Sequence, residues 1–343
     1  MKRIQSLDIL RGATMALMIL VNNPGCWKTA WPSLLHAPWN GLTFADLVFP
    51  LFLFVMGVSM YLSLRKGGFR LSWKIGKRAL LLIGIGLLLN FVSCFVRGND
   101  LSLFRVTGVL QRFGLCFGIA AVLVCTLPHK VLPYLAGGLL IAYEGILLAG
   151  NGFVQGPENI LARFDGALIP AAHLYGADGG VDPEGILSTL PCIAHTLLGF
   201  LTGKLMAEKK TRRVLYWGLT LSAAGLVASI WIPLNKTVWS PSFALLLCGL
   251  GTLILCGLYW LIDEKQLCRR NGFFLTFGTN AIYCYIVAAV LAWILDGSGF
   301  HKWYSLNIGA QGALLSLAYA VACVLLVWLS ALPLRRRGIY LKL

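Results

Sequence analysis

The side chains best suited to chemistry lie in one short stretch, SLLHAPWNGLTFADLVFPLFLFVMG, at residues 33–57. His36, Asn40 and Asp46 stand there directly before and at the start of an unbroken apolar run. A histidine titrates close to neutral pH, so His36 could act as a general base. Asp46 favours the positive start of a helix and could be only a cap or near-cap residue. The stretch predicts a histidine-centred site, although His36 could also be an interfacial residue in a belt of tryptophans.

More polar residues are expected at the same depth in the molecule. Asn22 ends the first apolar run, where Asn-Pro-Gly is also typical of an ordinary helix stop. Gln111 and Arg112 lie in the outer third of a later apolar run, and Arg112 is the natural ion-pair partner for Asp46. A histidine, several amides, an aspartate and an arginine at one level would form a polar chamber.

The composition is typical of a membrane protein. Of the 343 residues, 58% are hydrophobic and only 12% are charged, with a mean hydropathy of +0.78. A soluble domain carries about 25% charged residues. Apolar runs of about 20 residues favour helices that cross a ~30 Å hydrocarbon core over the shorter strands of a barrel. The predicted fold is an all-α polytopic membrane protein, and the ten cysteines, mostly in apolar runs, predict no disulfide framework.

Ten spans are predicted, and their even number puts both termini on one side of the membrane. With cytoplasmic termini, 21 of the 29 lysines and arginines fall in inside segments, six fall outside, and Arg11 and Arg112 lie within spans. This bias assigns the net charge of +16 to topology rather than to nucleic-acid binding. The longest outer loop, at about 150–184, is long enough to be functional or a lid. The predicted spans are 7–25, 43–64, 78–96, 107–126, 131–149, 185–206, 214–232, 242–262, 274–295 and 312–332.

Four other polar residues lie inside predicted spans, where such a residue is a functional hypothesis. Asp8 and Arg11 are three apart and share a helix face, either as a neutralised pair or as residues that reach the interface and set orientation. Arg11 is also on the side where a cytosolic anion would arrive. His195 and Asn280 each need a hydrogen-bonding partner, which could be part of the protein or a ligand.

A short outer turn, IPLNKTVWSPS at residues 232–242, combines residue types that suit a sugar. Tryptophan stacks on the apolar face of a sugar, and asparagine binds its hydroxyls. The alternative is an ordinary interfacial turn. From its residues alone the protein is a ten-helix transporter or membrane enzyme with a polar chamber that opens outward. The candidate substrate contacts are Trp39, Asn40, Gln111, Asn235, Lys236 and Trp239.

Specific sequence blocks are spread over nearly the whole chain: SLDILRG, ILVNN, HAPWNGLTFADLVFPLFLFVMGVSM, GVLQRFG, DPEGILSTLPCIAHTLLGFLTGKLM, IPLNKTVWSPSF and GTNAI. In this order they resemble the heparan-α-glucosaminide N-acetyltransferase family. We expect a short architecture without the N-terminal luminal domain and the extra leading span of the lysosomal enzymes, as in bacterial members. The resemblance therefore implies a multi-pass protein of a bacterial inner membrane, with one acetyltransferase domain over residues 1–343.

The resemblance also implies acetyl transfer from cytoplasmic acetyl-CoA to the amino group of a glucosamine-type sugar on the periplasmic side, without a metal. The family's active-site histidine falls on His36 and the asparagine of its VN motif on Asn22, with a slightly longer path between them here. His36 would take the proton of the amine or accept the acetyl group itself, and Asn22 would donate to the thioester oxygen. Asp46 would orient His36 or pair with Arg112. The candidate contacts to acetyl-CoA are Arg11, Arg112, His195, Lys204 and Asn280.

Two alternatives to this function remain. An amino-sugar permease could use the same chamber, although the sequence shows none of the internal symmetry that many transporters have. A membrane sugar O-acyltransferase would keep the chemistry and change the acceptor to a hydroxyl. The resemblance further suggests a homodimer, for which the sequence indicates no interface.

Overall fold

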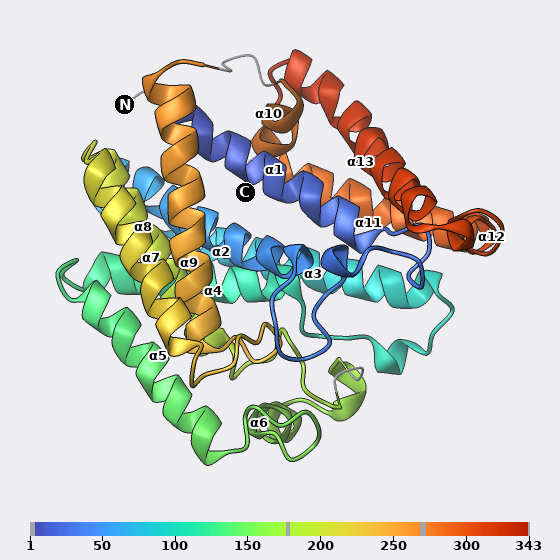
Figure 1. Cartoon of the computed structure of the whole chain (residues 1–343), viewed down its shortest axis with the longest axis horizontal. Helices are drawn as coiled ribbons and strands as arrows, with labels where there is room; N and C mark the ends of the chain where they lie inside the picture. The colour runs from blue at the N-terminus through green and yellow to red at the C-terminus, as the bar shows by residue number, and fades with distance from the viewer. Residues whose placement is uncertain (1–3, 176–178, 268–271, 342–343) are drawn as a thin grey trace. The chain divides into compact units, whose positions relative to one another are not determined.

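The computed structural model describes residues 4–175, 179–267 and 272–341, and these residues form α-helices and short turns without a strand (Figure 1). The helices are α1 (Gln5–Asn22), α2 (Phe44–Leu64), α3 (Trp73–Val96), α4 (Val109–Thr126), α5 (Leu132–Ala149), α6 (Ile160–Leu168), α7 (Thr189–Ala207), α8 (Thr211–Ala228), α9 (Pro241–Leu258), α10 (Gly272–Thr279), α11 (Ala281–Gly297), α12 (Phe300–Asn307) and α13 (Ala313–Arg336). Five basic residues that were assigned to the inside lie outside the described residues: Lys2, Arg3, Arg269, Arg270 and Lys342.

Each predicted span lies on a helix, and the predicted all-α membrane fold is confirmed at this level. Among the described residues, seven helices are long and apolar enough to cross a membrane. The pair α10 and α11, bent by 89°, makes an eighth candidate. The helices α1 and α8 are less apolar because polar and charged residues interrupt them. The count of ten spans and the side of the termini stay predictions.

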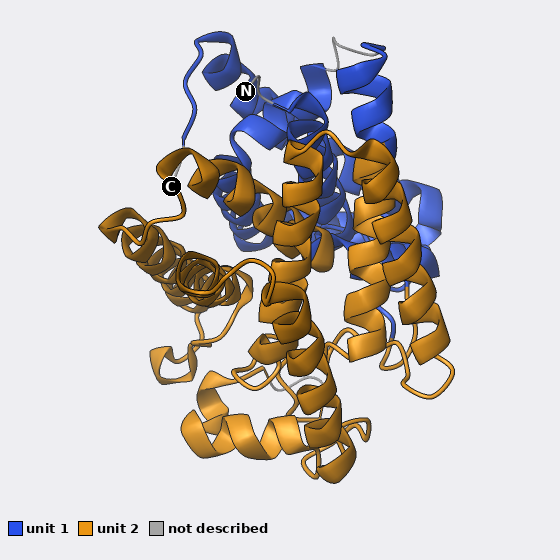
Figure 2. Ribbon diagram, turned by 90° about the vertical axis from the view of Figure 1, so that its left-hand side faces the viewer, with its two compact units in different colours: residues 1–37, 43–49, 257–343 blue, residues 38–42, 50–256 orange. Residues whose placement is uncertain are grey.

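The chain divides into two compact units, which Figure 2 draws in different colours. Unit 1 contains residues 1–37, 43–49 and 257–343, and unit 2 contains residues 38–42 and 50–256. Helix α2 therefore begins in unit 1 and continues into unit 2 after Phe49. The single functional domain stays a prediction.

Unit 1 is built around the contact of α1 with α10, where two glycines let the backbones touch. A Cβ atom on Gly12 would lie 1.9 Å from the carbonyl oxygen of Phe274, and one on Gly278 would lie 1.8 Å from that of Asp8. Small residues that permit such close approach are typical of helix pairs in membranes. The position of α1, which ends at Asn22, therefore depends on this contact.

Unit 2 uses the same device to pack α2 against α7. A Cβ atom on Gly57 would lie 2.2 Å from the carbonyl oxygen of Thr196, and one on Gly199 would lie 2.5 Å from that of Phe54. The long loop predicted at 150–184 is not structureless. It contains α6, which begins at the N-cap Asn159 and buries Leu161 and Asp165.

Candidate functional site

The start of helix α2 carries the histidine–aspartate pair. Asp46 lies in the first turn of α2, and only 1% of its side chain is exposed. His36 lies in the preceding loop with 47% of its side chain exposed. Its Nδ1 is 2.8 Å from Asp46 Oδ1. The second carboxylate oxygen of Asp46 accepts hydrogen bonds from the backbone amides of Ala37 and Thr43, both at 3.1 Å.

This hydrogen bond decides which nitrogen of His36 can do chemistry. An ionised carboxylate can only accept hydrogen bonds, so Nδ1 of His36 carries the proton that it donates to Asp46. In the neutral ring Nε2 is then the basic nitrogen. The buried Asp46 carboxylate thus orients the His36 ring so that Nε2 is the nitrogen that could act as a base or nucleophile. The expected ion pair of Asp46 with Arg112 stays a prediction.

Asn22, the other predicted catalytic residue, is the last residue of α1 and is exposed. Its neighbour Asn23 instead donates its side-chain amide to the carbonyl of Ile19 at 2.7 Å. The segment from Asn22 to His36, which was expected to be longer than in the family, is hydrogen-bonded to another part of unit 1. The Gly25 amide donates to the Ser316 carbonyl at 3.1 Å.

In unit 2 the structure brings the predicted substrate residue Asn40 together with the turn at 232–242. Asn235 donates to the side-chain oxygen of Asn40 at 3.0 Å, although 195 positions separate them. Trp39 donates its indole N–H to the carbonyl of Phe153 at 2.8 Å. Asn40 is exposed and Asn235 is buried, so Asn235 supports Asn40 from beneath. Lys236, in the same turn, is half-buried.

Trp239 differs from its predicted role because it belongs to the core of unit 2. The residue is fully buried, and its ring packs edge-on against His195 and Phe243 with centroids 5.7 and 5.5 Å apart. A sugar can stack only on an uncovered ring, so we assign Trp239 a packing role. The sequence signalled the residue type correctly, but it carried no information on burial.

His195 and Gln111 are also buried and engaged within unit 2. The His195 ring nitrogen Nε2 lies 3.1 Å from the carbonyl of Pro50 in α2, which makes His195 a bridge between α7 and α2. Gln111 donates to the carbonyl of Val106 at 3.2 Å. These contacts give both side chains a supporting role, but Nδ1 of His195 is buried without a hydrogen-bond partner among the described residues. The predicted cofactor contact of His195 and the predicted substrate contact of Gln111 stay predictions.

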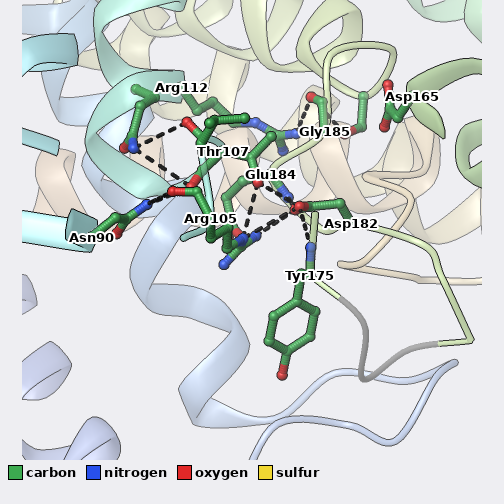
Figure 3. Close-up of polar contacts among 12 residues, drawn as sticks. Asn90, Arg105, Thr107, Arg112, Asp165, Tyr175, Asp182, Glu184 and Gly185 are labelled. Carbon is green, nitrogen blue, oxygen red and sulfur yellow. Dashed lines mark hydrogen bonds and ion pairs between the residues drawn. The ribbon is translucent and has the colours of Figure 1, made fainter. Parts of the chain in front are cut away.

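Arg112 anchors the turn that precedes α7 (Figure 3). Its guanidinium is fully buried and donates to the carbonyl of Gly185 at 2.7 Å and to the hydroxyl of Ser188. From the other side, Asp165 of α6 accepts from the amides of Ile186 and Leu187 at 3.0 and 3.1 Å. Arg112 therefore holds this turn, while its Nε has no hydrogen-bond partner among the described residues. Its predicted contact with acetyl-CoA stays a prediction.

Next to this turn lies an ion-pair cluster that the sequence reading missed (Figure 3). Arg105 pairs with Asp182 and Glu184, and the Asp182 carboxylate also accepts from Thr107. The Tyr175 ring lies 4.8 Å from the Arg105 guanidinium. Arg105 had been counted only as an outer-loop charge, and no local spacing links it to residues more than 70 positions away.

Burial acts on the two aspartates of this region with different results. Burial alone would raise the pKa of Asp182, but the Arg105 guanidinium and the hydrogen bonds from Arg105 and Thr107 outweigh it, and the pKa lies below its usual range. For Asp165, burial raises the pKa of the carboxyl despite the two amide hydrogen bonds. Asp182 is thus stabilised as an anion, whereas Asp165 resists ionisation.

The remaining predicted contacts to acetyl-CoA divide into two kinds. Arg11 donates to Asp8 at 3.0 Å and to the carbonyl of Gly278 at 3.2 Å, which confirms the predicted pair and also ties α1 to α10. Asn280, buried at the break before α11, donates to the carbonyl of Ile339 at 3.2 Å and thereby holds the C-terminal segment. Lys204 lies half-buried in the last turn of α7.

Comparison with known proteins supports the family resemblance. The family model described as heparan-alpha-glucosaminide N-acetyltransferase, catalytic, matches residues 3–231. The human heparan-alpha-glucosaminide N-acetyltransferase is 30% identical and the mouse protein of that name is 29% identical, each over 95% of this chain. The chain spans 60% of the length of either relative. By the extent of these matches, the chain belongs to the heparan-alpha-glucosaminide N-acetyltransferase catalytic family.

Proposed function

We propose that the protein is a transmembrane N-acetyltransferase. It moves an acetyl group from cytoplasmic acetyl-CoA to the amino group of a glucosamine-type sugar on the opposite side of the membrane. Family membership supports this reaction, and the seven apolar helices support a multi-pass membrane location. The observation that carries the proposal is the His36–Asp46 pair, in which a buried anion orients a half-exposed imidazole.

The direct reaction needs a base that accepts the proton of the amine while the acetyl group moves from sulfur to nitrogen. The amine nitrogen forms a bond to the thioester carbon, the C–S bond breaks, and the sulfur leaves as the thiolate of CoA. Nε2 of His36 takes the proton that the amine loses and returns it to the thiolate. The positive charge that forms on the ring lies next to the Asp46 carboxylate, which stabilises it.

A two-step route through His36 uses the same atoms. Nε2 attacks the thioester carbon, the C–S bond breaks, and the sulfur leaves as the thiolate of CoA. The amine then forms a bond to the acetyl carbon, the bond from that carbon to Nε2 breaks, and the freed Nε2 accepts the proton that the amine loses. Asp46 stabilises the acylated ring through the proton on Nδ1. A rapid-quench measurement that finds labelled acetyl on wild-type protein but not on His36→Ala would select this route.

Asn22 serves in this proposal as a donor to the thioester oxygen, where negative charge develops in the transition state. Its exposed position at the end of α1 supports this role. Lys204 and Arg11 are the candidates for the phosphates of CoA. Of the two, Lys204 is better suited, because Asp8 already neutralises Arg11. The amino-sugar acceptor, the homodimer and the bacterial inner-membrane location stay predictions.

The first test is acetyl transfer by the purified protein. Wild-type protein in detergent, given acetyl-CoA and glucosamine, is expected to release free CoA and form N-acetylglucosamine. His36→Ala is expected to lower the rate by about 10²-fold or more, the usual contribution of a general base. Equal rates for wild type and His36→Ala would contradict the proposal.

Two further measurements separate the alternatives. A permease would carry labelled glucosamine into sealed vesicles without acetyl-CoA, whereas the proposed enzyme would not. An O-acyltransferase would form an ester, which hydroxylamine cleaves, whereas the amide of N-acetylglucosamine resists it. The amide is the expected product.

A further inference from the structure

We propose that Thr43 is a positioning residue for acetyl transfer, which fixes the Asp46 carboxylate so that one of its oxygens faces His36. This inference rests on the proposed function, because Thr43 acts only through Asp46 and His36. The residue was not among those that the sequence pointed to. It lies one position before α2, which begins at Phe44.

The two oxygens of the Asp46 carboxylate have separate tasks. Oδ2 accepts three hydrogen bonds, from the Thr43 amide at 3.1 Å, the Thr43 hydroxyl at 2.9 Å and the Ala37 amide at 3.1 Å. Oδ1 accepts from Nδ1 of His36 at 2.8 Å. Rotation of the carboxylate would break the three bonds on Oδ2 together. The bonds on Oδ2 therefore determine where Oδ1 points.

Local sequence explains why these groups meet. Thr43 and Asp46, three residues apart at the start of α2, form one half of a capping box, in which the acidic side chain reaches back to the amide of the residue before the helix. The Thr43 hydroxyl, which in a full capping box accepts from the amide of the acidic residue, here donates to the Asp46 carboxylate. An ordinary capping box uses one oxygen of the acid. Here the second oxygen remains available for His36. The first turn of α2 thus fixes the carboxylate that contacts His36 in the preceding loop.

Burial makes this arrangement sensitive to a single hydroxyl. The Asp46 side chain is 1% exposed, so water does not readily replace a lost donor. The His36 side chain is 47% exposed and has less surrounding protein to restrain it. The 2.8 Å contact of its Nδ1 with the Asp46 carboxylate is therefore one of the restraints on its orientation. The Ala37 amide, bound to the same carboxylate, fixes the adjacent backbone.

The alternative is that Thr43 only stabilises the helix start. Kinetic measurements on Thr43→Val, Thr43→Ser and the double variant with Asp46→Asn distinguish the two roles. Thr43→Val removes the hydroxyl at nearly constant volume and is expected to lower kcat about tenfold, with an unchanged KM for acetyl-CoA. Thr43→Ser restores the donor and is expected to return kcat to within about twofold of wild type. In the Asp46→Asn background Thr43→Val is expected to have no further effect, because the group it positions is gone.

A matched control removes a hydroxyl elsewhere in unit 1. The buried Thr14 hydroxyl donates to the Leu10 carbonyl at 2.8 Å and contacts neither member of the pair. Thr14→Val is expected to leave kcat unchanged. If Thr43→Val has wild-type kcat, or lowers kcat equally in the Asp46→Asn background, the positioning role is wrong.

A readout without turnover separates this inference from the proposed function. Nitrogen-15 NMR of histidine-labelled protein reports which ring nitrogen carries the proton, and His36→Ala assigns the signal. Wild type is expected to show the Nδ1-protonated ring, and Thr43→Val a mixture with the Nε2-protonated form. The same tautomer in both proteins would overturn the role of Thr43. If Thr43→Val changes the tautomer of His36 but His36→Ala keeps the wild-type rate of acetyl transfer, the positioning role holds and the proposed function is wrong.

Discussion

Asn22 and Asn23 are neighbours in sequence but differ in what their side chains do. Asn23 donates to the Ile19 carbonyl and so completes the last turn of α1. Asn22 is exposed, and among the described residues its side chain makes no hydrogen bond. A buried or engaged amide could not meet a substrate without losing a bond. Asn22 is therefore the better candidate for an oxyanion donor.

The pair provides a prediction with a built-in control. Asn22→Ala is expected to lower kcat for acetyl transfer by about 10²-fold, because a donor to a developing oxyanion acts mainly in the transition state. The KM for acetyl-CoA is expected to change little. Asn23→Ala is expected to keep kcat within a few-fold and to lower the Tm slightly, because it removes only a structural hydrogen bond. Steady-state kinetics and thermal denaturation check both variants, and a reversed order of effects would contradict the assignment.

The sequence was informative about residue type and silent about burial. His36 and Asp46 were found because polar residues stand out beside an apolar run, and the structure places them in contact. Trp239 was proposed as a sugar platform by its type, yet it lies in the core. Thr43 was missed because a threonine before a helix is common, and its significance depends on which atoms its acidic partner contacts.

At the scale of elements, one arginine and one aspartate hold the turn at 185–188 by hydrogen bonds. Arg112 of α4 binds the carbonyl of Gly185, and Asp165 of α6 binds the amides of Ile186 and Leu187. The turn leads into α7, which carries Lys204 at its other end. Displacement of the turn would thus shift α7, so Arg112 positions its neighbours, and its contact with acetyl-CoA stays a prediction.

The planar guanidinium of Arg112 donates two hydrogen bonds in a fixed geometry, so replacement by lysine tests how much these bonds contribute to stability. Lysine keeps the charge but cannot reproduce both hydrogen bonds, so Arg112→Lys is expected to lower the free energy of unfolding by about 3 kcal/mol. The exposed Arg97→Lys is expected to change it by less than about 0.5 kcal/mol. Denaturation in detergent checks both. A normal stability with a raised KM for acetyl-CoA would instead support the predicted cofactor contact.

Glycines at helix crossings lead to a second prediction at this scale. Gly12→Ala places a Cβ atom against the Phe274 backbone, which is not able to move independently of α10, and is expected to cost about 3 kcal/mol or more. Gly84→Ala, in the exposed middle of α3, meets nothing within 4 Å and is expected to be neutral or to stabilise by up to about 1 kcal/mol. The yield of monodisperse protein and the Tm check both. A folded Gly12→Ala protein with wild-type Tm would show that α1 and α10 do not depend on backbone contact.

Helices were predicted correctly where a long apolar run indicates a membrane span, and less well where no such run is present. All ten predicted spans overlap helices, because a membrane requires long apolar runs. Helix α6 was missed because its nine residues lie in a polar loop, where length provides no signal. The break at Asn280 was read as part of one continuous span, because the bend depends on contacts to the C-terminal segment.

For the whole molecule, the small number of acidic residues makes acid stability a simple question. The chain has only 13 aspartates and glutamates, so few groups can account for a loss of stability at low pH. Asp182 has a pKa below its ordinary value of 3.8 because Arg105 and its hydrogen-bond donors outweigh burial. Asp165 has a raised pKa because of burial. The two residues therefore contribute to the pH dependence with opposite signs.

The sign for Asp182 follows from its lowered pKa. A carboxyl with a lower pKa in the folded state adds stability above its unfolded pKa of 3.8, and this stability is lost as the pH falls below that value. Asp165 adds stability as the neutral acid, and this is lost as the pH rises through its raised pKa. The wild-type Tm is therefore expected to fall as the pH drops below about 4, where the Asp182 carboxylate becomes protonated. Asp182→Asn is expected to have a lower Tm at pH 7 and a shallower decline in acid. Asp165→Asn is expected to keep the acid decline, because the Asp182 pair is intact. Equal acid slopes for wild type and Asp182→Asn would mean that the pair of Asp182 with Arg105 does not control acid unfolding, and that the outer segment opens without affecting the rest of the molecule.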